Sequence, residues 1–239
     1  MTILTGYLLL CIIGAILQGI SGIGFSMFFM AFCPLLVSYT IAANSNRLIG
    51  LALAVCGLLQ WREGVRWKLL LPPLTASLAC SALGVETFVR ADEEILKRLL
   101  GILLLVLSAG TWFLQKRDIR IHPNALSGLV FGAVAGFASG LFGILGPILA
   151  IYYVSATEQT EEYKGTLNMH FVILSLWNNL FYGLQYGYQS VEIGLSVMGA
   201  AGAITAMLVV FRLEISRQRD KAASFMLFLT SVMAVTMLF

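Results

Sequence analysis

Hydrophobic residues gather in eight blocks along the chain, separated by short hydrophilic segments. The blocks are residues 3–38, 41–60, 68–89, 98–114, 125–155, 166–186, 191–211 and 223–239. A helix rises about 1.5 Å per residue, so about 20 apolar residues cross the hydrocarbon core of a bilayer. Six of the blocks fit that length. The pattern therefore predicts an all-α polytopic membrane protein.

The first and fifth blocks are too long for one membrane helix and too short for two full ones. Both contain a cluster of glycines, at residues 14–24 and 132–143, and a proline, Pro34 or Pro147. Glycine weakens helices and allows backbone conformations that other residues avoid. We therefore expect each block to form two half-length helices joined by non-helical backbone. Such backbone is tolerated at membrane depth only where protein or a water-filled cavity surrounds it.

The two glycine clusters resemble each other and lie 118 residues apart, so that Ser21-Gly22 corresponds to Ser139-Gly140. This duplication predicts two homologous halves, residues 1–119 and 120–239, each opening with a glycine-broken helix pair. Duplicated, interrupted hydrophobic segments are typical of secondary transporters and point to their binding site.

Two topologies are compatible with the blocks. If each long block crosses once, the halves are parallel repeats and basic residues divide nearly evenly between the two faces. If each long block returns to its own side, the loops 61–68, 115–124, 156–165 and 212–222 share one face. That face then holds eleven Lys and Arg residues, against three on the other. The positive-inside rule favours this second topology, with inverted repeats and both termini outside.

The composition supports a membrane protein and excludes several other classes. Of the 239 residues, 59% are hydrophobic and 11% are charged, and the mean hydropathy is +0.89. The net charge of +3 is spread over short loops, which argues against a nucleic-acid partner. The sequence has no carboxylate pair, nucleophile–base set or HExxH motif, so we do not expect an enzyme. The four cysteines form no CxxC pair, and no metal or cofactor is expected.

Arg47 is the one basic residue that lies inside an apolar block rather than near its end. A helix starting near Thr40 would place it about 10 Å deep, where a charge usually marks a functional site. The alternative is an arginine that reaches to the membrane surface. His170 holds the matching place in the second half if its helix starts near Tyr163. It would bind substrate or a coupling proton, or serve only as a packing and hydrogen-bonding residue.

Further candidates surround these two residues. Asn46 lies beside Arg47, and Asn168 lies beside His170, while Asn44, Asn178 and Asn179 are additional amides within the blocks. At the glycine clusters, half-helix N-termini would present backbone N–H groups to an anion, with Ser21 and Ser139 adding hydroxyls. The alternative is close helix packing through small residues. Glu86 and Glu192 lie near block ends and are interpreted as structural. The predicted binding residues are Ser21, Gly22, Gly24, Asn46, Arg47, Ser139, Gly140, Gly143, Gly146, Asn168 and His170.

The chain resembles the sulfite exporter TauE/SafE family, also called the toluenesulfonate uptake permease group. The resemblance rests on Gly19-Ile20-Ser21-Gly22-Ile23-Gly24 and on Ser139-Gly140-Leu141-Phe142-Gly143-Ile144-Leu145-Gly146-Pro147, and on the size and duplication of the whole chain. It implies a bacterial membrane transporter of sulfite, sulfoacetate or related anions. The family usually has consecutive glycines after each Ser-Gly, whereas here Phe25 and Ser26 stand in the first run and Leu145 in the second.

These observations together predict a multi-pass transporter of the bacterial inner membrane that carries a small anion by alternating access. Sulfite or an organosulfonate is the expected substrate, and proton coupling and a homodimer are left open. Two alternatives are a passive anion channel and a membrane subunit that assembles a partner without transporting anything.

Overall fold

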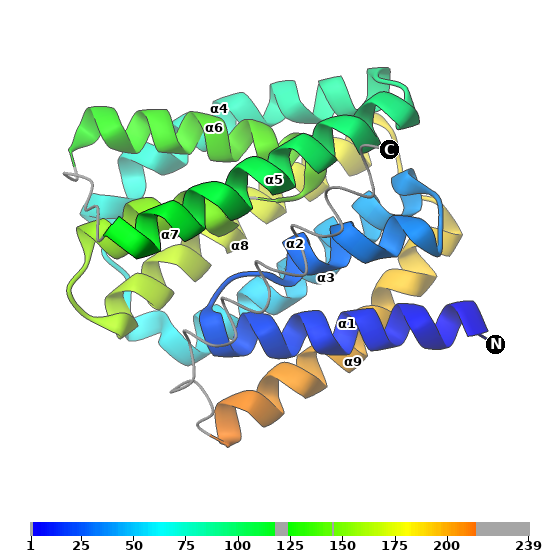
Figure 1. The fold of residues 1–239 in the computed structure, drawn as a ribbon, viewed down its shortest axis with the longest axis horizontal. Helices are drawn as coiled ribbons and strands as arrows, with labels where there is room; N and C mark the ends of the chain where they lie inside the picture. Colours follow the sequence, from blue (N-terminus) through cyan, green and yellow to red (C-terminus); the bar gives the residue numbers. More distant parts are fainter. Residues whose placement is uncertain (1, 118–123, 145, 214–239) are drawn as a thin grey trace. The chain divides into compact units, whose positions relative to one another are not determined.

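The computed structural model describes residues 2–117, 124–144 and 146–213. In this part of the chain, nine α-helices and two short 3₁₀ helices form the whole secondary structure, with no strand (Figure 1). The eighth block, residues 223–239, and the boundary between residues 119 and 120 lie outside the described residues. The helices are α1 (Thr2–Ser21), α2 (Phe25–Phe32), η1 (Cys33–Leu35), α3 (Tyr39–Trp61), η2 (Arg62–Gly64), α4 (Trp67–Arg90), α5 (Glu93–Arg117), α6 (Ala125–Phe142), α7 (Gly146–Ala156), α8 (Thr160–Gln185) and α9 (Ser190–Arg212).

Five of these helices, α1, α3, α4, α6 and α9, are long and apolar enough to cross a membrane. The prediction of an all-α polytopic membrane protein is therefore confirmed. Each long apolar block is broken at its glycines, as predicted, but the expectation of two half-length helices was wrong. The first helix of each block is a full one, with 20 residues in α1 and 18 in α6. Only α2 and α7 are short, with 8 and 11 residues, and the break lies past the middle of each block.

The chain forms two compact units, and each unit draws on both halves of the sequence. Unit 1 comprises residues 1–53, 91–117 and 188–239, and unit 2 comprises residues 54–90 and 118–187. Unit 1 thus combines α1, α2, the first part of α3 and α5 with α9, which comes from the second half. Unit 2 combines α6, α7 and α8 with α4, which comes from the first half. The division into homologous halves at residues 1–119 and 120–239 stays a prediction.

In unit 1, α2 folds back along α1 as a hairpin (Figure 1). A Cβ at Gly14 would lie 2.9 Å from Cδ2 of Phe25, and a Cβ at Gly6 would lie 3.2 Å from Cδ1 of Leu36. Between these two levels, the rings of Tyr7 and Phe29 pack edge to face with centroids 5.6 Å apart. The segment from Phe25 to Leu36 therefore returns to the level at which α1 begins.

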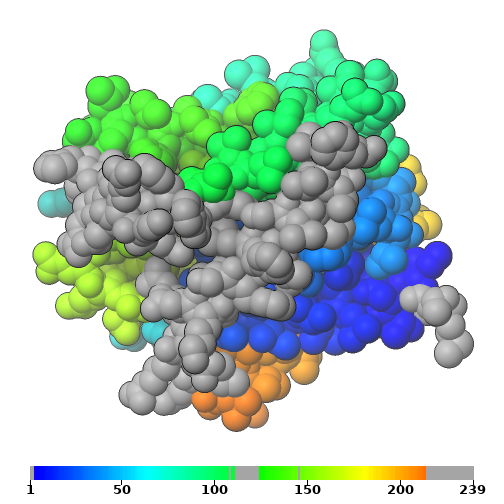
Figure 2. All heavy atoms as spheres, in the orientation of Figure 1, coloured from blue at the N-terminus to red at the C-terminus, as the bar shows by residue number. Residues whose placement is uncertain are grey.

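Helix α9 packs beside α1 in the same unit and in the same direction. A Cβ at Gly199 would lie 2.9 Å from Sγ of Cys11, and one at Gly19 would lie 3.0 Å from Cγ1 of Val210. Apolar side chains cover the outer faces of this pair, and Figure 2 shows α1 in blue and part of α9 in orange at the surface. Exposed members are Ile3, Leu9 and Ile13 of α1 and Val197, Leu208 and Val209 of α9. Lipid is the solvent in which such faces are stable.

In unit 2, four glycines spaced four residues apart form one row along α6, at Gly128, Gly132, Gly136 and Gly140. Residues at this spacing share a helix face, and this face rests directly on the backbone of α4. A Cβ at Gly132 would lie 2.1 Å from the carbonyl oxygen of Pro73, and a Cβ at Gly136 would lie 2.3 Å from that of Ser77. Small residues allow this approach because van der Waals packing rather than hydrophobic burial joins helices in lipid.

The second hairpin of the fold, formed by α6 and α7, also lies in unit 2. The ring of Tyr152 in α7 packs against Phe131 in α6 with centroids 6.0 Å apart, so α7 runs back along α6. Helix α8 begins against the end of α3, where a Cβ at Gly165 would lie 2.4 Å from the Trp61 carbonyl oxygen. Each unit therefore contains one broken hairpin, one full helix packed parallel to its long arm, and part of α3, while α5 belongs to unit 1 and α8 to unit 2.

The glycine row predicts that even one added methyl group separates α6 from α4. Gly136→Ala should lower the free energy of unfolding by about 1–3 kcal/mol, the range for overpacking a close contact. Gly194→Ala in α9 is the matched control, because no atom lies within 4 Å of the position of its Cβ. Unfolding of each purified variant in detergent measures its free energy of unfolding. Equal stability of the two variants would contradict the packing of α6 on α4.

Candidate functional site

The break between α1 and α2 lies at Gly22 and Gly24, which take positive φ values of 83° and 118°. Only glycine adopts such angles without strain. The Gly22 amide donates to the Gln18 carbonyl at 2.7 Å, which closes the last turn of α1. The Ser21 hydroxyl lies 2.7 Å from the Leu17 carbonyl and also contacts the Ile23 carbonyl. Ser21 therefore caps the break itself.

The break between α6 and α7 is built in the same way. Gly143 has a φ of 71°, and its amide donates to the Ser139 carbonyl at 2.8 Å. Helix α7 begins at Gly146, followed by Pro147. Proline is well tolerated in the first turn of a helix, where its missing N–H has no intrahelical acceptor. Leu145, which interrupts the glycines here, lies outside the described residues.

The two breaks match at a spacing of 121 residues, not 118. Gly22 corresponds to Gly143 by conformation and hydrogen bond, and Gln18 therefore corresponds to Ser139. The starts of α2 and α7, Phe25 and Gly146, differ by the same 121 positions. The expected pairing of Ser21-Gly22 with Ser139-Gly140 was wrong. These identical residue pairs stand at different distances from the left-handed glycine that ends each helix, Gly22 or Gly143.

Ser139 and Gly140 have separate environments although they are neighbours in α6. The buried Ser139 hydroxyl accepts a hydrogen bond from Nδ2 of Asn178 in α8 at 3.0 Å. The Oδ1 atom of Asn178 is buried without a hydrogen-bond partner among the described residues. Gly140 instead packs on α4, where a Cβ would lie 2.1 Å from the Ser81 carbonyl oxygen. Gly140 thus takes the packing role that was the alternative to anion binding.

Arg47 lies in the middle of a buried polar cluster in unit 1. Its side chain is only 4% exposed, and Nη1 donates to Oδ1 of Asn44 one helical turn earlier at 2.7 Å. The other end of that amide, Nδ2, donates to Oε1 of Glu192 in α9 at 2.7 Å. Asn46 is also buried. The arginine side chain is therefore enclosed by protein, and its charge faces a carboxylate through one amide.

His170 lies in a second buried polar cluster, in unit 2, and is 0% exposed. Its Nδ1 lies 2.8 Å from the Tyr153 hydroxyl, and its Nε2 lies 3.0 Å from the Ser77 hydroxyl. Ser77 has one proton and lies 2.6 Å and 2.9 Å from the carbonyl oxygens of Pro73 and Gly132. Because those carbonyls only accept, Ser77 donates to one of them and accepts from Nε2. Nδ1 then accepts from Tyr153, and His170 is assigned as the neutral Nε2–H tautomer.

By its distance from the start of its helix, Asn168 rather than His170 matches Arg47. Helix α3 begins at Tyr39 and α8 at Thr160, again 121 residues apart, so Arg47 and Asn168 are each the ninth residue of their helix. The expected match with His170 was wrong because α8 begins three residues before Tyr163. The acidic residues Glu161 and Glu162 form its first turn, where the helix dipole favours negative charge.

The amide of Asn168 packs closely within unit 2. Its Nδ2 donates to the Lys164 carbonyl of its own helix at 2.8 Å, and a Cβ at Gly57 would lie 2.3 Å from its Oδ1. The structure thus places Ser21, Gly22, Gly24, Asn46 and Arg47 in unit 1. Ser139, Gly140, Gly143, Gly146, Asn168 and His170 lie in unit 2. That these two sets form one binding site stays a prediction.

Three residues of these clusters were not expected from the sequence. Glu192 was interpreted as structural because it lies near a block end, yet it is 1% exposed in the first turn of a membrane helix. The signal for it was that Glu192 is the one acidic residue of α9, whose other charged residue, Arg212, stands at the opposite end. Ser77 and Tyr153 are ordinary membrane-helix residues in the sequence, and only their contacts with His170 reveal them.

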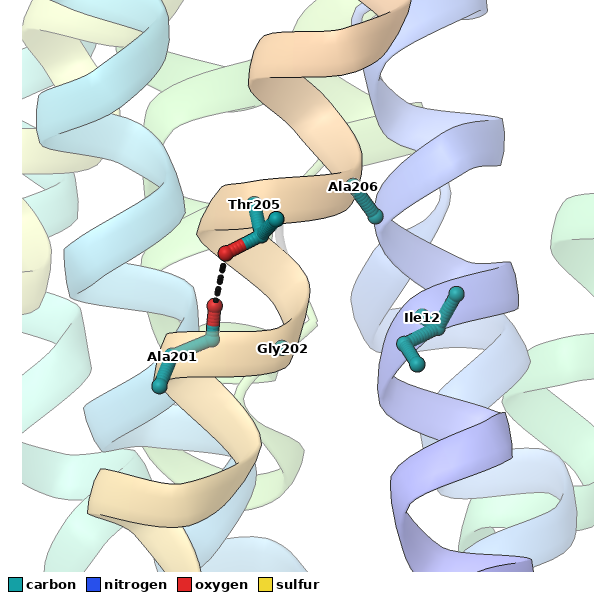
Figure 3. A pocket seen from close by; sticks show the side chains of 5 residues that line it. All are labelled: Ile12, Ala201, Gly202, Thr205 and Ala206. Atoms are coloured by element: carbon teal, nitrogen blue, oxygen red, sulfur yellow. Dashed lines mark hydrogen bonds between the residues drawn. The ribbon is translucent and has the colours of Figure 1, made fainter.

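A shallow, open hollow lies between α1 and α9, lined by Ile12, Ala201, Gly202, Thr205 and Ala206 (Figure 3). Its one polar side chain, Thr205, points its hydroxyl at the Ala201 carbonyl 2.8 Å away. The hollow therefore presents no donor to an anion, and its apolar lining suits a lipid chain.

Comparison with known proteins identifies the family of the chain. The model of the family described as sulfite exporter TauE/SafE matches residues 7–238, nearly the whole chain. The chain belongs to the TauE/SafE family. No curated protein and no solved structure matches it. As a member of a transporter family with five apolar spanning helices, this TauE/SafE protein is a multi-pass membrane protein.

The left-handed glycine at the second break predicts an order among substitutions. Gly143→Ala should lower stability by about 1–2 kcal/mol, because a Cβ in this conformation meets the following carbonyl. Gly143→Asn should cost less, since asparagine tolerates this conformation best after glycine. Thermal unfolding of the two variants measures the order, and an alanine variant at least as stable as the asparagine variant would contradict the assigned conformation.

The His170 cluster predicts unequal effects at two adjacent tyrosines. Tyr153→Phe leaves Nδ1 of His170 buried without a donor and should cost about 1–3 kcal/mol. Tyr152→Phe is the control, because the Tyr152 hydroxyl makes no hydrogen bond among the described residues, and it should change stability little. Denaturation in detergent compares them, and a larger loss for Tyr152→Phe would refute the assignment.

Proposed function

We propose that this TauE/SafE protein is a secondary transporter that carries sulfite or a related organosulfonate across the bacterial inner membrane by alternating access. The observation that carries the proposal is Arg47, a buried arginine in the membrane helix α3. An arginine is costly in a membrane and is retained there for function. Its planar fork donates paired hydrogen bonds to the oxygens of an oxyanion.

The broken hairpins support an anionic substrate. The first N–H groups of α2 and α7 have no acceptor within their own helices, and the helix dipole makes these ends positive. Both helices begin directly after a non-helical segment, which is how transporters place such ends inside the membrane. Backbone donors and Arg47 would together bind an oxyanion without a metal.

Burial of Arg47 supports a carrier rather than an open pore. A side chain that is 4% exposed is reached by a solute only after part of the protein moves. A carrier requires such a closed state in each cycle, whereas a channel needs a continuous path when open. Proton coupling through His170 stays a prediction: with a proton on Nδ1, the Tyr153 hydroxyl would have to accept this hydrogen bond instead of donating it.

The spacing of the helices supports two homologous halves of opposite orientation. Helices α2 and α7, and helices α3 and α8, begin 121 residues apart, and the hairpin of α1 and α2 returns Leu36 to the level of Gly6. A block that returns to its own side gives each half an odd number of crossings, which inverts the second half. The distribution of basic residues in the loops favours the same topology.

Ligand binding tests the proposed function directly. Sulfite or a short organosulfonate should raise the melting temperature of the purified protein, because a ligand that binds only the folded state stabilises it. Arg47→Gln should abolish this shift, and Arg62→Gln, at an exposed arginine in η2 beyond the end of α3, should leave it unchanged. A screen of sulfite, thiosulfate, sulfoacetate, taurine and short carboxylates identifies the preferred anion.

Flux in proteoliposomes then separates the mechanisms. A carrier saturates and exchanges labelled anion for unlabelled anion across the membrane, whereas a channel shows no counterflow. Absence of both binding and flux for every anion in the screen would refute transport and favour an assembly subunit. Binding that survives Arg47→Gln would show that the site lies elsewhere.

A further inference from the structure

We propose that Glu192 is a positioning residue for Arg47, acting through the amide of Asn44, and that it holds the guanidinium in the orientation that binds the anion. The inference rests on the proposed function and adds a residue from α9 to the site. Glu192 and Asn44 are 148 positions apart in the chain and belong to the same compact unit.

The direction of the Asn44 side chain follows from its two neighbours. A carboxylate only accepts hydrogen bonds, so Asn44 must present Nδ2 to Oε1 of Glu192. The Oδ1 atom of the same amide then faces Nη1 of Arg47. If the amide were reversed, donors would face donors on the arginine side and acceptors would face acceptors on the glutamate side. Glu192 therefore orients Asn44 so that its Oδ1 accepts the hydrogen bond from Nη1 of Arg47.

A second role of Glu192 has to be separated from this one. Its Oε2 accepts from the backbone N–H of Gln189 at 2.8 Å, which forms a capping box at the start of α9. The two carboxylate oxygens thus serve different partners. Glutamine also serves at this position of a capping box, so Glu192→Gln keeps the cap through its one amide oxygen. The NH2 group of the introduced glutamine then faces Asn44.

In Glu192→Gln, the hydrogen-bond donors and acceptors around Asn44 change, and this affects the orientation of Arg47. An NH2 group at residue 192 favours the reversed amide of Asn44, which turns Oδ1 away from Arg47. Removal of a nearby negative charge would by itself strengthen anion binding. Weaker binding therefore reports lost orientation, because lost charge and lost orientation change the affinity in opposite directions.

The network also predicts a rescue. In Asn44→Asp alone, a second carboxylate faces Glu192 and the two repel each other. In the double variant Asn44→Asp/Glu192→Gln, the carboxylate moves to residue 44, where it accepts from both Arg47 and the glutamine NH2. The total charge equals that of the wild type, and every donor meets an acceptor. A residue that served only the cap of α9 would give no such rescue.

The experiment measures the dissociation constant of sulfite, or of the best anion from the screen, in the purified full-length protein. Glu192→Gln should weaken binding about tenfold, the effect of one hydrogen bond to a charged group. Glu86→Gln is the matched control, because Glu86 is paired with Arg90 at a more exposed position, and it should leave the affinity unchanged. Equal or tighter binding in Glu192→Gln would overturn the inference.

Melting temperatures of the wild type, the two single variants and the double variant test the network without any ligand. The double variant should melt higher than either single variant, and melting below both would overturn the inference. If the wild type binds no anion, the proposed function fails, while the order of the four melting temperatures still decides whether Glu192 orients Asn44 and Arg47. If the wild type binds and Arg47→Gln abolishes binding but Glu192→Gln does not weaken it, only the positioning role fails.

Discussion

Backbone groups without hydrogen-bond partners are so unfavourable away from water that a helix ends inside a protein only where its last turn is closed. Here the closure is a left-handed glycine whose amide bonds the carbonyl four residues earlier, at Gly22 and at Gly143. These two residues decide where α1 and α6 stop and where the chain turns back. The hairpins, and with them the positions of the helix starts at α2 and α7, depend on this local geometry.

The same requirement governs the polar side chains within the helices. Arg47 is buried beside Asn44, which in turn contacts Glu192, while His170 bonds Tyr153 and Ser77. Each cluster joins residues from helices of both sequence halves, since α9 contributes to unit 1 and α4 to unit 2. The carboxylate of Glu192, one amide away, partly balances the buried positive charge of Arg47.

Much of the architecture was predictable because hydropathy and glycine placement are local signals. The apolar blocks within the described residues are helical, and the first and fifth blocks are broken at their glycines. The errors arose where two segments have similar residues but a different position relative to the ends of their helices. Ser21 and Ser139 look equivalent but stand at different distances from the glycine that ends each helix. His170 seemed to match Arg47 because the charged first turn of α8, with Glu161 and Glu162, was read as a loop.

By itself the sequence determined the membrane class, the α-helical fold, the two interruptions and the place of Arg47 within an apolar helix. These features follow from transfer of apolar side chains out of water and from the freedom of glycine at positive φ, both of which act within a few residues. Only the tertiary structure decided that Glu192 lies beside Asn44, that Ser77 and Tyr153 bond His170, and that Gly140 packs on α4. Hydrogen bonds and close backbone contacts between residues far apart in the chain depend on which helix faces pack together, and no local pattern encodes that choice.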